Sequence, residues 1–107
     1  MIANKKIFEL HANICKALGH PIRIEIIDAL QDKELSFSEL LEKTDSPKSN
    51  LSQHLSSMAA KGILVQRKEG QSCFYRLSSE KVSIACQIMR EVLIENLKKQ
   101  NELLNHI

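Results

Sequence analysis

Aromatic residues, glycine and proline are scarce in this chain of 107 residues. It contains no Trp, one Tyr, three Phe, three Gly and two Pro. A core built from this composition must be mainly aliphatic, and 43% apolar beside 26% charged residues is ordinary for a globular domain. The length, with no linker, repeat or low-complexity stretch, predicts a single domain over residues 1–107.

Long apolar runs and paired cysteines are missing as well. No run of 18 apolar residues occurs, and the opening MIANKKIFEL lacks the apolar stretch of a secretory signal. Three cysteines (Cys15, Cys73 and Cys86) are an odd number at wide spacing, with no CxxC knuckle for zinc. We therefore expect a cytoplasmic protein with reduced thiols and no membrane partner.

Patterns that carry catalysis are also absent. No Ser, His and acid arrangement, phosphate-cradling glycine loop or pair of carboxylates occurs at a spacing typical of an active site. The sequence therefore predicts neither an enzyme nor a bound cofactor.

Acidic residues are missing from one long segment. Residues 46–62, SPKSNLSQHLSSMAAKG, include no Asp or Glu, although acids account for 13 of the 107 residues. Residues 46–77 carry five basic residues against one acid, whereas the other 75 carry ten against twelve. A Lys/Arg excess is often only a solvated face, but a surface without carboxylates favours a polyphosphate partner, with binding that weakens as salt rises.

Apolar spacing predicts four helices in the first part of the chain. The first covers residues 5–18. Pro21 opens the second, with His20 near its cap, and Ser36 with Glu39 forms a capping box for a short third helix. Ser46 is expected to cap the fourth helix, which Pro47 begins.

The fourth helix has one apolar and one polar side. Leu51, Leu55 and Met58 share an arc that should be buried, while small polar residues lie opposite. Two short helices joined by a tight turn form a helix-turn-helix pattern, and Gln53 can make the paired contact that suits adenine. The expected major-groove contacts are Lys48, Ser49, Asn50, Ser52, Gln53 and Ser56.

A β-hairpin is expected next. Residues 63–68 and 72–77 are extended runs separated by Glu-Gly-Gln, which predicts a wing lying along phosphates or in the minor groove. Its expected DNA contacts are Arg67, Lys68, Gln71 and Arg76.

The last helix, residues 80–104, is long and apolar for so small a domain. The first helix also has a wide apolar arc, because Phe8, His11 and Cys15 form a second stripe beside Ile7, Leu10 and Ile14. Pairing both helices with a second copy is the economical solution. We therefore expect a fold that is mainly α with a small β-hairpin, a winged helix-turn-helix, dimeric through its first and last helices.

The sequence resembles the ArsR family of bacterial winged helix-turn-helix repressors in three motifs. They are CKALGHPIRI (15–24), SNLSQHL (49–55), and EGQ (69–71) followed by FYRL (74–77). The resemblance covers about residues 8–92. It implies a homodimer that occupies a palindromic double-stranded DNA operator and releases it when an effector binds.

The effector sites of the family's best-known members are not reproduced. Metalloid-sensing relatives carry two cysteines where this chain has Ser36 and Ser38, and a hydroxyl is a poor ligand for a thiophilic ion. Zinc-sensing relatives place two histidines on the last helix, which here contains only His106. Persulfide-sensing relatives use a cysteine where Asp28 stands and a second in the last helix, where this chain has Cys86.

The remaining cysteines and histidines leave alternatives open. Cys15 and Cys86 can pack in the dimer interface, act as a thiol sensor, or hold a metal ion with His11. Cys73 is expected to pack in its strand. His54 is expected to pack or contact a phosphate, rather than to bind a metal. The inducer itself is not predicted.

The main rival function is a winged-helix module that binds proteins and not DNA. Such a surface should carry apolar anchors at its centre. Ser49, Ser52, Gln53 and Ser56 provide none, so we expect a sequence-specific transcriptional regulator, a homodimeric repressor released from its operator by an effector or by thiol modification.

Overall fold

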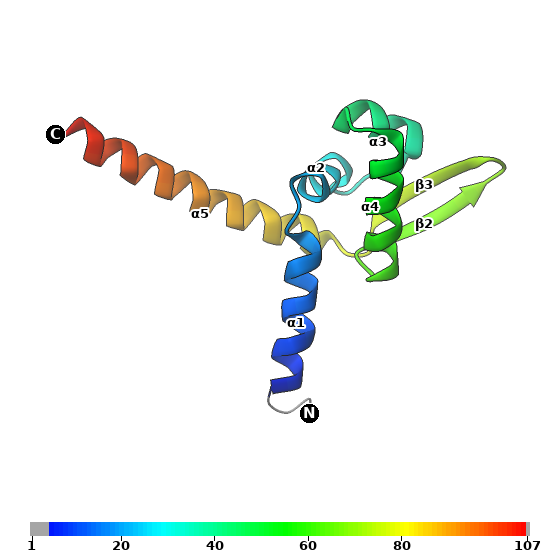
Figure 1. Ribbon diagram of the computed structural model, residues 1–107, viewed down its shortest axis with the longest axis horizontal. Coiled ribbons are helices and arrows are strands. Elements are labelled where there is room, and N and C mark those ends of the chain that lie inside the picture. Colours follow the sequence, from blue (N-terminus) through cyan, green and yellow to red (C-terminus); the bar gives the residue numbers. More distant parts are fainter. Residues whose placement is uncertain (1–4, 107) are drawn as a thin grey trace.

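A computed structural model describes residues 5–106 (Figure 1). Within that range the chain is mainly helical with a small antiparallel sheet, which confirms the expected fold class. The elements are α1 (Lys5–Leu18), α2 (Pro21–Leu30), β1 (Leu35–Ser36), α3 (Phe37–Thr44), α4 (Lys48–Ala60), β2 (Leu64–Glu69), β3 (Ser72–Leu77) and α5 (Glu80–Asn105).

Local signals place most helix starts correctly. Pro21 is the first residue of α2, after His20 in extended conformation, although the His20 side chain makes no capping hydrogen bond. The capping box of α3 is confirmed: the Glu39 N–H donates to Ser36 Oγ at 3.1 Å, and the Ser36 N–H donates to Glu39 Oε1 at 3.0 Å. Hydrogen bonding with the backbone N–H of Ser36, and then with its side chain, lowers the pKa of the Glu39 carboxyl.

The start of α4 differs from the prediction. The residue before its first turn is Pro47, and Ser46 does not cap the helix. Ser46 Oγ lies 2.9 Å from Thr44 Oγ1, which itself donates to the Leu40 carbonyl at 2.8 Å. The Ser46 hydroxyl therefore helps to close the turn between α3 and α4, where Asp45 adopts a left-handed conformation with φ of 47°.

The sheet has the order β1-β3-β2. β2 and β3 form the expected hairpin, hereafter the wing, with Glu69 opposite Ser72 and a two-residue turn of Gly70 and Gln71. Gly70 has φ of +62°, a region that other residues rarely adopt. β1 is an addition that the sequence did not predict: Leu35 pairs with Tyr75.

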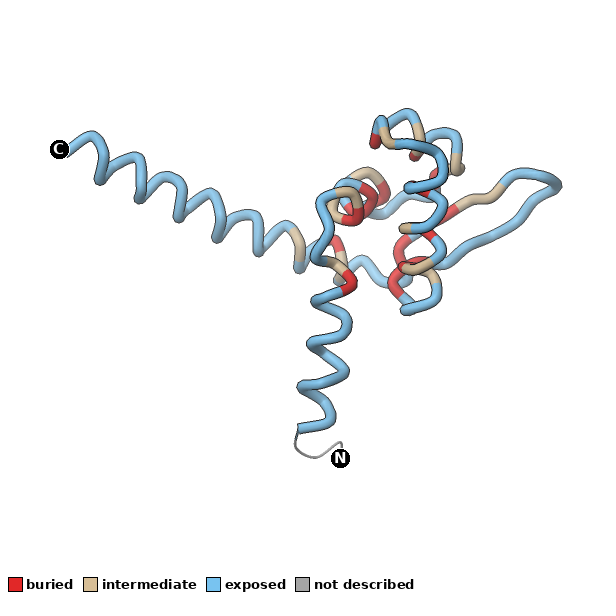
Figure 2. Tube along the Cα trace, viewed as in Figure 1, coloured by how far each residue is buried: buried red, intermediate tan, exposed pale blue. Residues whose placement is uncertain are grey.

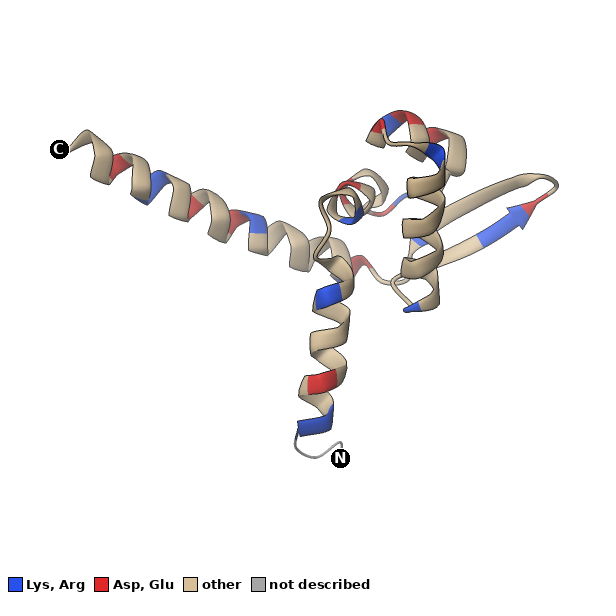
Figure 3. Cartoon of the chain, in the orientation of Figure 1, with Lys and Arg blue, Asp and Glu red and all other residues tan. Residues whose placement is uncertain are grey.

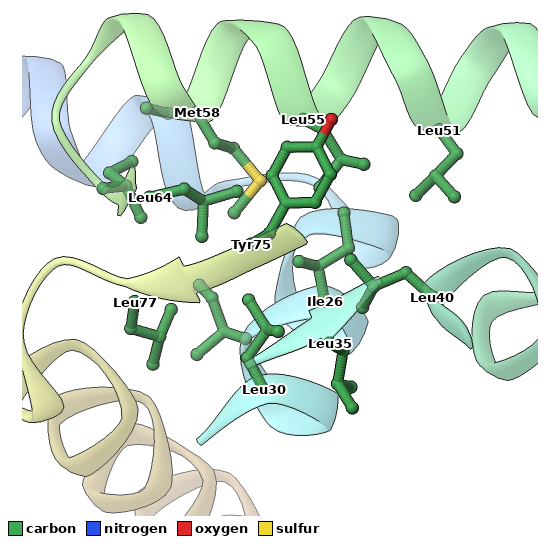
Figure 4. Close-up of a cluster of buried hydrophobic side chains, with 13 residues drawn as sticks. Ile26, Leu30, Leu35, Leu40, Leu51, Leu55, Met58, Leu64, Tyr75 and Leu77 are labelled. Carbon is green, nitrogen blue, oxygen red and sulfur yellow. The ribbon is translucent and has the colours of Figure 1, made fainter. Parts of the chain in front are cut away.

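The core is aliphatic, as the composition required. Figure 4 shows Leu55 and Met58 of α4 beside Tyr75 of the sheet and Leu51 on the side of Leu40, and all three α4 residues are fully buried. Ile26 and Leu30 of α2 close the other side. α4 is thereby fixed in rotation about its axis, and its opposite side faces out.

α1 and α5 project from this core (Figure 1), and Figure 2 shows both helices exposed along almost their whole length. Ala17 is the buried residue of α1, and Ser83 that of α5. Among residues 5–106 no helix combines the length and apolarity needed to cross a membrane.

Candidate nucleic-acid interface

The side of α4 that faces away from the core carries all six expected major-groove residues, and each is exposed. We call this set the polar face of α4: Lys48, Ser49, Asn50, Ser52, Gln53 and Ser56. It projects no carboxylate, because α4 contains no Asp or Glu. Short side chains allow the helix backbone to approach another surface closely, and amide and hydroxyl groups can both donate and accept hydrogen bonds.

α4 is also connected to the helices behind it by a buried arginine that the sequence analysis did not single out. Arg23 of α2 is 9% exposed. Its Nε donates to His54 Nδ1 of α4 at 2.9 Å, and its Nη1 donates to the carbonyl of Ala17 at 2.9 Å. Arg23 therefore connects the end of α1, the start of α2 and the middle of α4.

His54 consequently packs inward. Its ring accepts the Arg23 hydrogen bond and lies 5.5 Å from the His20 ring, measured between centroids. Burial lowers the pKa of His54, and the neighbouring positive charge of Arg23 and the His20 ring lower it further. The neutral imidazole that results is the form whose Nδ1 can accept a hydrogen bond.

The wing divides its basic residues between two faces. Residues paired in an antiparallel ladder share a face, and successive residues alternate. Lys68 pairs with Cys73 and so lies on the face of buried Tyr75, toward α4. Arg67 and Arg76 lie on the opposite face, while Gln71 is exposed at the tip. The sequence had grouped these four residues without separating the faces.

Arg67 is already engaged by two carboxylates. Its Nη2 and Nε contact the two carboxylate oxygens of Glu34 at 2.8 and 3.2 Å, and its Nη1 contacts Glu69 at 2.8 Å. The guanidinium also lies over the Phe74 ring, 4.6 Å from its centroid. The hydrogen bonds from Arg67 lower the pKa of Glu34, and both carboxylates raise the pKa of Arg67. Arg67 thus joins the wing to the segment before β1.

Arg76 lies on the same face of the wing as Arg67. Arg76 Nη1 donates weakly to the Leu77 carbonyl at 3.4 Å, and its side chain remains exposed. Figure 3 shows acidic and basic residues mixed along α5 and on α3, whereas α4 carries basic residues at its ends and the wing carries basic residues with an acidic one at its tip. The segment without carboxylates therefore corresponds to one element of the surface, α4.

The candidate sensor residues meet in one place. His11, Cys15, Cys86 and Arg90 line a largely apolar hollow of about 730 Å³ between α1, α2 and α5, which we call the thiol hollow. Burial raises the pKa of the half-buried Cys86 thiol, which disfavours its reactive thiolate, whereas Cys15 is exposed. Within residues 5–106 no three His, Cys, Asp or Glu side chains gather as a metal site.

Two further positions that the sequence analysis discussed, Asp28 and Cys73, lie outside the thiol hollow. Asp28 accepts a hydrogen bond from Arg90 of α5 at 3.2 Å, so an ion pair connects α2 to α5 there. Cys73 is half-buried in β3, with its sulfur 3.5 Å from Gln66 Nε2. Cys73 thus packs against the core from its strand, as expected.

Comparison with known proteins supports this geometry. Residues 18–67, from the end of α1 into β2, match a family described as a helix-turn-helix domain. The transcriptional activator HlyU of Vibrio cholerae is 35% identical over 79 residues, which span 74% of this chain and 73% of that protein. The biofilm growth-associated repressor of Agrobacterium fabrum is 36% identical over 72 residues, 67% of this chain and 62% of that protein.

Solved structures of other proteins superimpose on this fold. HlyU of Vibrio cholerae superimposes with a TM-score of 0.75 at 32% identity, covering 83% of this chain and 97% of that one. Rv0081 of Mycobacterium tuberculosis gives 0.79 at 28% identity, covering 91% and 98%. The homodimeric winged helix-turn-helix domain Mb0332 of Mycobacterium bovis has the same fold, with a TM-score of 0.77 at 23% identity over 92% of this chain and 95% of that one. The chain belongs to the ArsR family of winged helix-turn-helix transcriptional regulators, and its function is to bind DNA and regulate transcription.

Proposed function

We propose that two copies of this chain pair through α1 and α5, insert the polar face of α4 into successive major grooves of a palindromic operator, and block transcription. The observation that carries the proposal is the exposed, carboxylate-free polar face of α4, held rigidly by the core. The named relatives include an activator and a repressor. A promoter reporter with and without the protein tests whether the chain activates or represses transcription, and repression is expected.

The dimer is proposed from unpaired apolar surface. In the single chain the apolar side chains of α1 and α5 remain exposed to solvent, which an isolated domain of this size rarely tolerates. A two-fold pairing would cover both helices at once and set the two α4 helices one helical turn of DNA apart. The exposed residues are Ile7, Phe8, Leu10, Ile14, Ile84, Ile88, Met89, Val92, Leu93, Ile94, Leu97, Leu103 and Leu104.

On each half-site, α4 supplies both kinds of contact. No side chain caps its first turn, and no acid lies there, so its first N–H groups and Lys48 suit a phosphate. Gln53 lies one turn further along and suits a base edge. Ser49, Asn50, Ser52 and Ser56 surround Gln53 and allow close approach. Phosphate contacts set the register, and base contacts specify the sequence.

In the wing, we assign Lys68 and Gln71 to the phosphates or minor groove next to the half-site, with Arg76 reaching the backbone from the other face. Arg67 has a different role in this proposal. Its pairing with Glu34 and Glu69 braces the wing against β1 and neutralises its charge.

A pair of alanine variants tests this division. Lys68→Ala is expected to weaken binding to specific and random duplexes alike and to reduce the slope of log affinity against log salt by about one per subunit, because one phosphate contact is lost. Arg67→Ala removes the same charge from the adjacent position but should change the slope less. Fluorescence anisotropy over a salt series measures both, and equal slopes for Lys68→Ala and the parent protein would contradict the assignment.

We further propose that modification of Cys15 and Cys86 in the thiol hollow alters the dimer and releases the operator. The two thiols lie on the two proposed dimerisation helices, so a bond between them would restrain how these helices pack. Other effectors acting at the same interface would give the same outcome.

Duplex titrations with reduced, diamide-oxidised and tetrasulfide-treated protein test this proposal, since diamide takes up the two electrons of disulfide formation and tetrasulfide supplies sulfane sulfur for a persulfide. Either oxidation is expected to lower operator affinity by about 5- to 150-fold, the usual range of allosteric coupling. Cys15→Ser and Cys86→Ser should abolish the response, and Cys73→Ser, in the wing, should retain it. If both interface variants respond like the parent protein, the thiols only pack and the inducer acts elsewhere.

The protein-interaction module remains the competing function. It would need an apolar anchor at the centre of the polar face, and α4 exposes none there. An operator on the chromosome also implies that the protein works in the cytoplasm.

A further inference from the structure

A second hollow, of about 710 Å³, lies on the other side of α1, between α1, the start of α2 and the end of α4. We call it the basic hollow. One wall is polar and positively charged, formed by Lys16, His20, Arg23 and Lys61, and the facing wall includes Leu10 and Ile14. None of the residues that line it is acidic.

This lining differs from that of two other polar hollows. A hollow of about 370 Å³ beside α2 is lined by Glu25 and Asp28 together with lysines. Another, of about 200 Å³, includes Asp32 and Glu80. In both, cations and carboxylates balance each other locally, whereas the basic hollow has no such balance.

The lack of a negative counter-charge is energetically costly at Arg23, because this residue is buried. A buried guanidinium is normally paired with a carboxylate, because removing a charge from water is expensive. Here its hydrogen bonds go to two neutral acceptors, the Ala17 carbonyl and His54. Among residues 5–106 no carboxylate forms an ion pair with it. An anion in the basic hollow would supply the missing counter-charge.

The position of Arg23 gives such an anion a route to α4. The same guanidinium holds the last turn of α1 through Ala17 and the middle of α4 through His54. A negative group bound to Arg23 would compete with these two neutral acceptors for the guanidinium. It would thereby bias the angle between α1, the proposed dimerisation helix, and the polar face of α4. An effector acts by binding one arrangement of such helices more tightly than another.

We propose that the basic hollow binds a small organic anion, with a carboxylate or phosphate group on the basic wall and an apolar body against Leu10 and Ile14. The proposed dimer also uses Leu10 and Ile14, so occupancy would compete with the packing of α1 against the partner and change operator affinity. The effect on operator affinity rests on the proposed function, but the binding site itself does not. A backbone phosphate of the operator has the same chemistry and is the other source of an anion, since Ser57 and Lys61 continue the row of α4 that starts at Gln53.

The test uses phenyl phosphate, inorganic phosphate and benzyl alcohol as probes, titrated without DNA into the full-length protein labelled with ¹⁵N. Phenyl phosphate is expected to shift the amide signals around His20, Arg23 and Ser57 and to raise Tm. Inorganic phosphate should act more weakly because it lacks the apolar body, and benzyl alcohol should leave the spectrum unchanged because it lacks the charge.

Arg23 is buried, so its replacement would disturb the core. Substitutions of exposed residues at the edge of the basic hollow test binding without this effect on folding. Lys16→Ala with Lys61→Ala, both exposed, should weaken phenyl phosphate binding by about tenfold, as loss of two exposed charge contacts allows. Lys99→Ala, on α5, removes a charge away from the hollow and should bind like the parent protein.

The outcomes are separable. Unchanged spectra and Tm with phenyl phosphate up to about 10 mM would overturn the site, since that limit corresponds to negligible affinity. If the probe has no effect but Lys61→Ala lowers the salt slope of duplex binding, the basic wall serves the operator backbone and the free-anion site is likewise overturned. Because the first titrations contain no DNA, a chain without duplex affinity would contradict the proposed function and leave this site standing.

Discussion

Leu97→Glu is expected to convert the protein from a dimer to a monomer and to lower operator affinity by about 10²- to 10⁴-fold, the avidity that two linked half-site contacts provide. Leu97 lies on α5, 53% exposed, on the same face as Leu93 and Leu104. A carboxylate buried in an apolar dimer interface would lack a partner. Light scattering after gel filtration measures the mass, and anisotropy with an operator duplex measures the affinity.

The matched control is Lys98→Gln, which changes the net charge by the same single unit at the adjacent position. Lys98 shares the polar side of α5 with Gln87 and Glu91. The Lys98→Gln variant should remain dimeric. Circular dichroism should show the same helix content in both variants, because Leu97 is not part of the core of the single chain. A dimeric Leu97→Glu protein with parental affinity would show that α5 does not form the interface.

Gln53→Ala is expected to erode the preference for operator over random DNA by about 1 to 3 kcal/mol per lost base contact, or about 5- to 150-fold per subunit. Within residues 5–106 the Gln53 amide has no hydrogen-bond partner, and its side chain is exposed on the polar face. Binding to random DNA should be nearly unchanged, because that binding depends on phosphates. Competition titrations with both duplexes measure the ratio.

Lys48→Ala provides the contrast, since a phosphate contact contributes equally to both duplexes. It should weaken both and preserve their ratio. If Gln53→Ala lowers both affinities by the same factor, Gln53 does not contact a base and the recognition surface lies elsewhere on the chain.

The parts of the fold that were predicted from the sequence depend on near neighbours. Helical spacing of Leu51, Leu55 and Met58 correctly separated the buried side of α4 from its exposed side. The Ser36 and Glu39 box and Pro21 at the first position of α2 are signals within one turn of helix. The hairpin followed from Gly70 between two extended runs.

The parts that were missed depend on residues far apart in the chain. β1 is only two residues long and exists because β3 lies beside it, so no local pattern marks it. Glu34 and Arg67 are 33 residues apart, and Arg23 and His54 are 31 apart. An arginine among the isoleucines of α2 was the one available signal for Arg23, but only the packed structure identifies its partners. The cap of α4 failed because the Ser46 hydroxyl has a nearer partner in Thr44.

The central claim is that the polar face of α4 and the α4 side of the wing form the surface that docks on duplex DNA. Amide chemical-shift mapping of the ¹⁵N-labelled protein with a duplex of about 20 base pairs, two helical turns, at low salt tests it most directly. The account predicts that perturbed amides cluster in residues 48–56 and 68–71 and leave the acidic α3 surface little changed. Perturbations confined to α5, or none at any salt concentration, would contradict it.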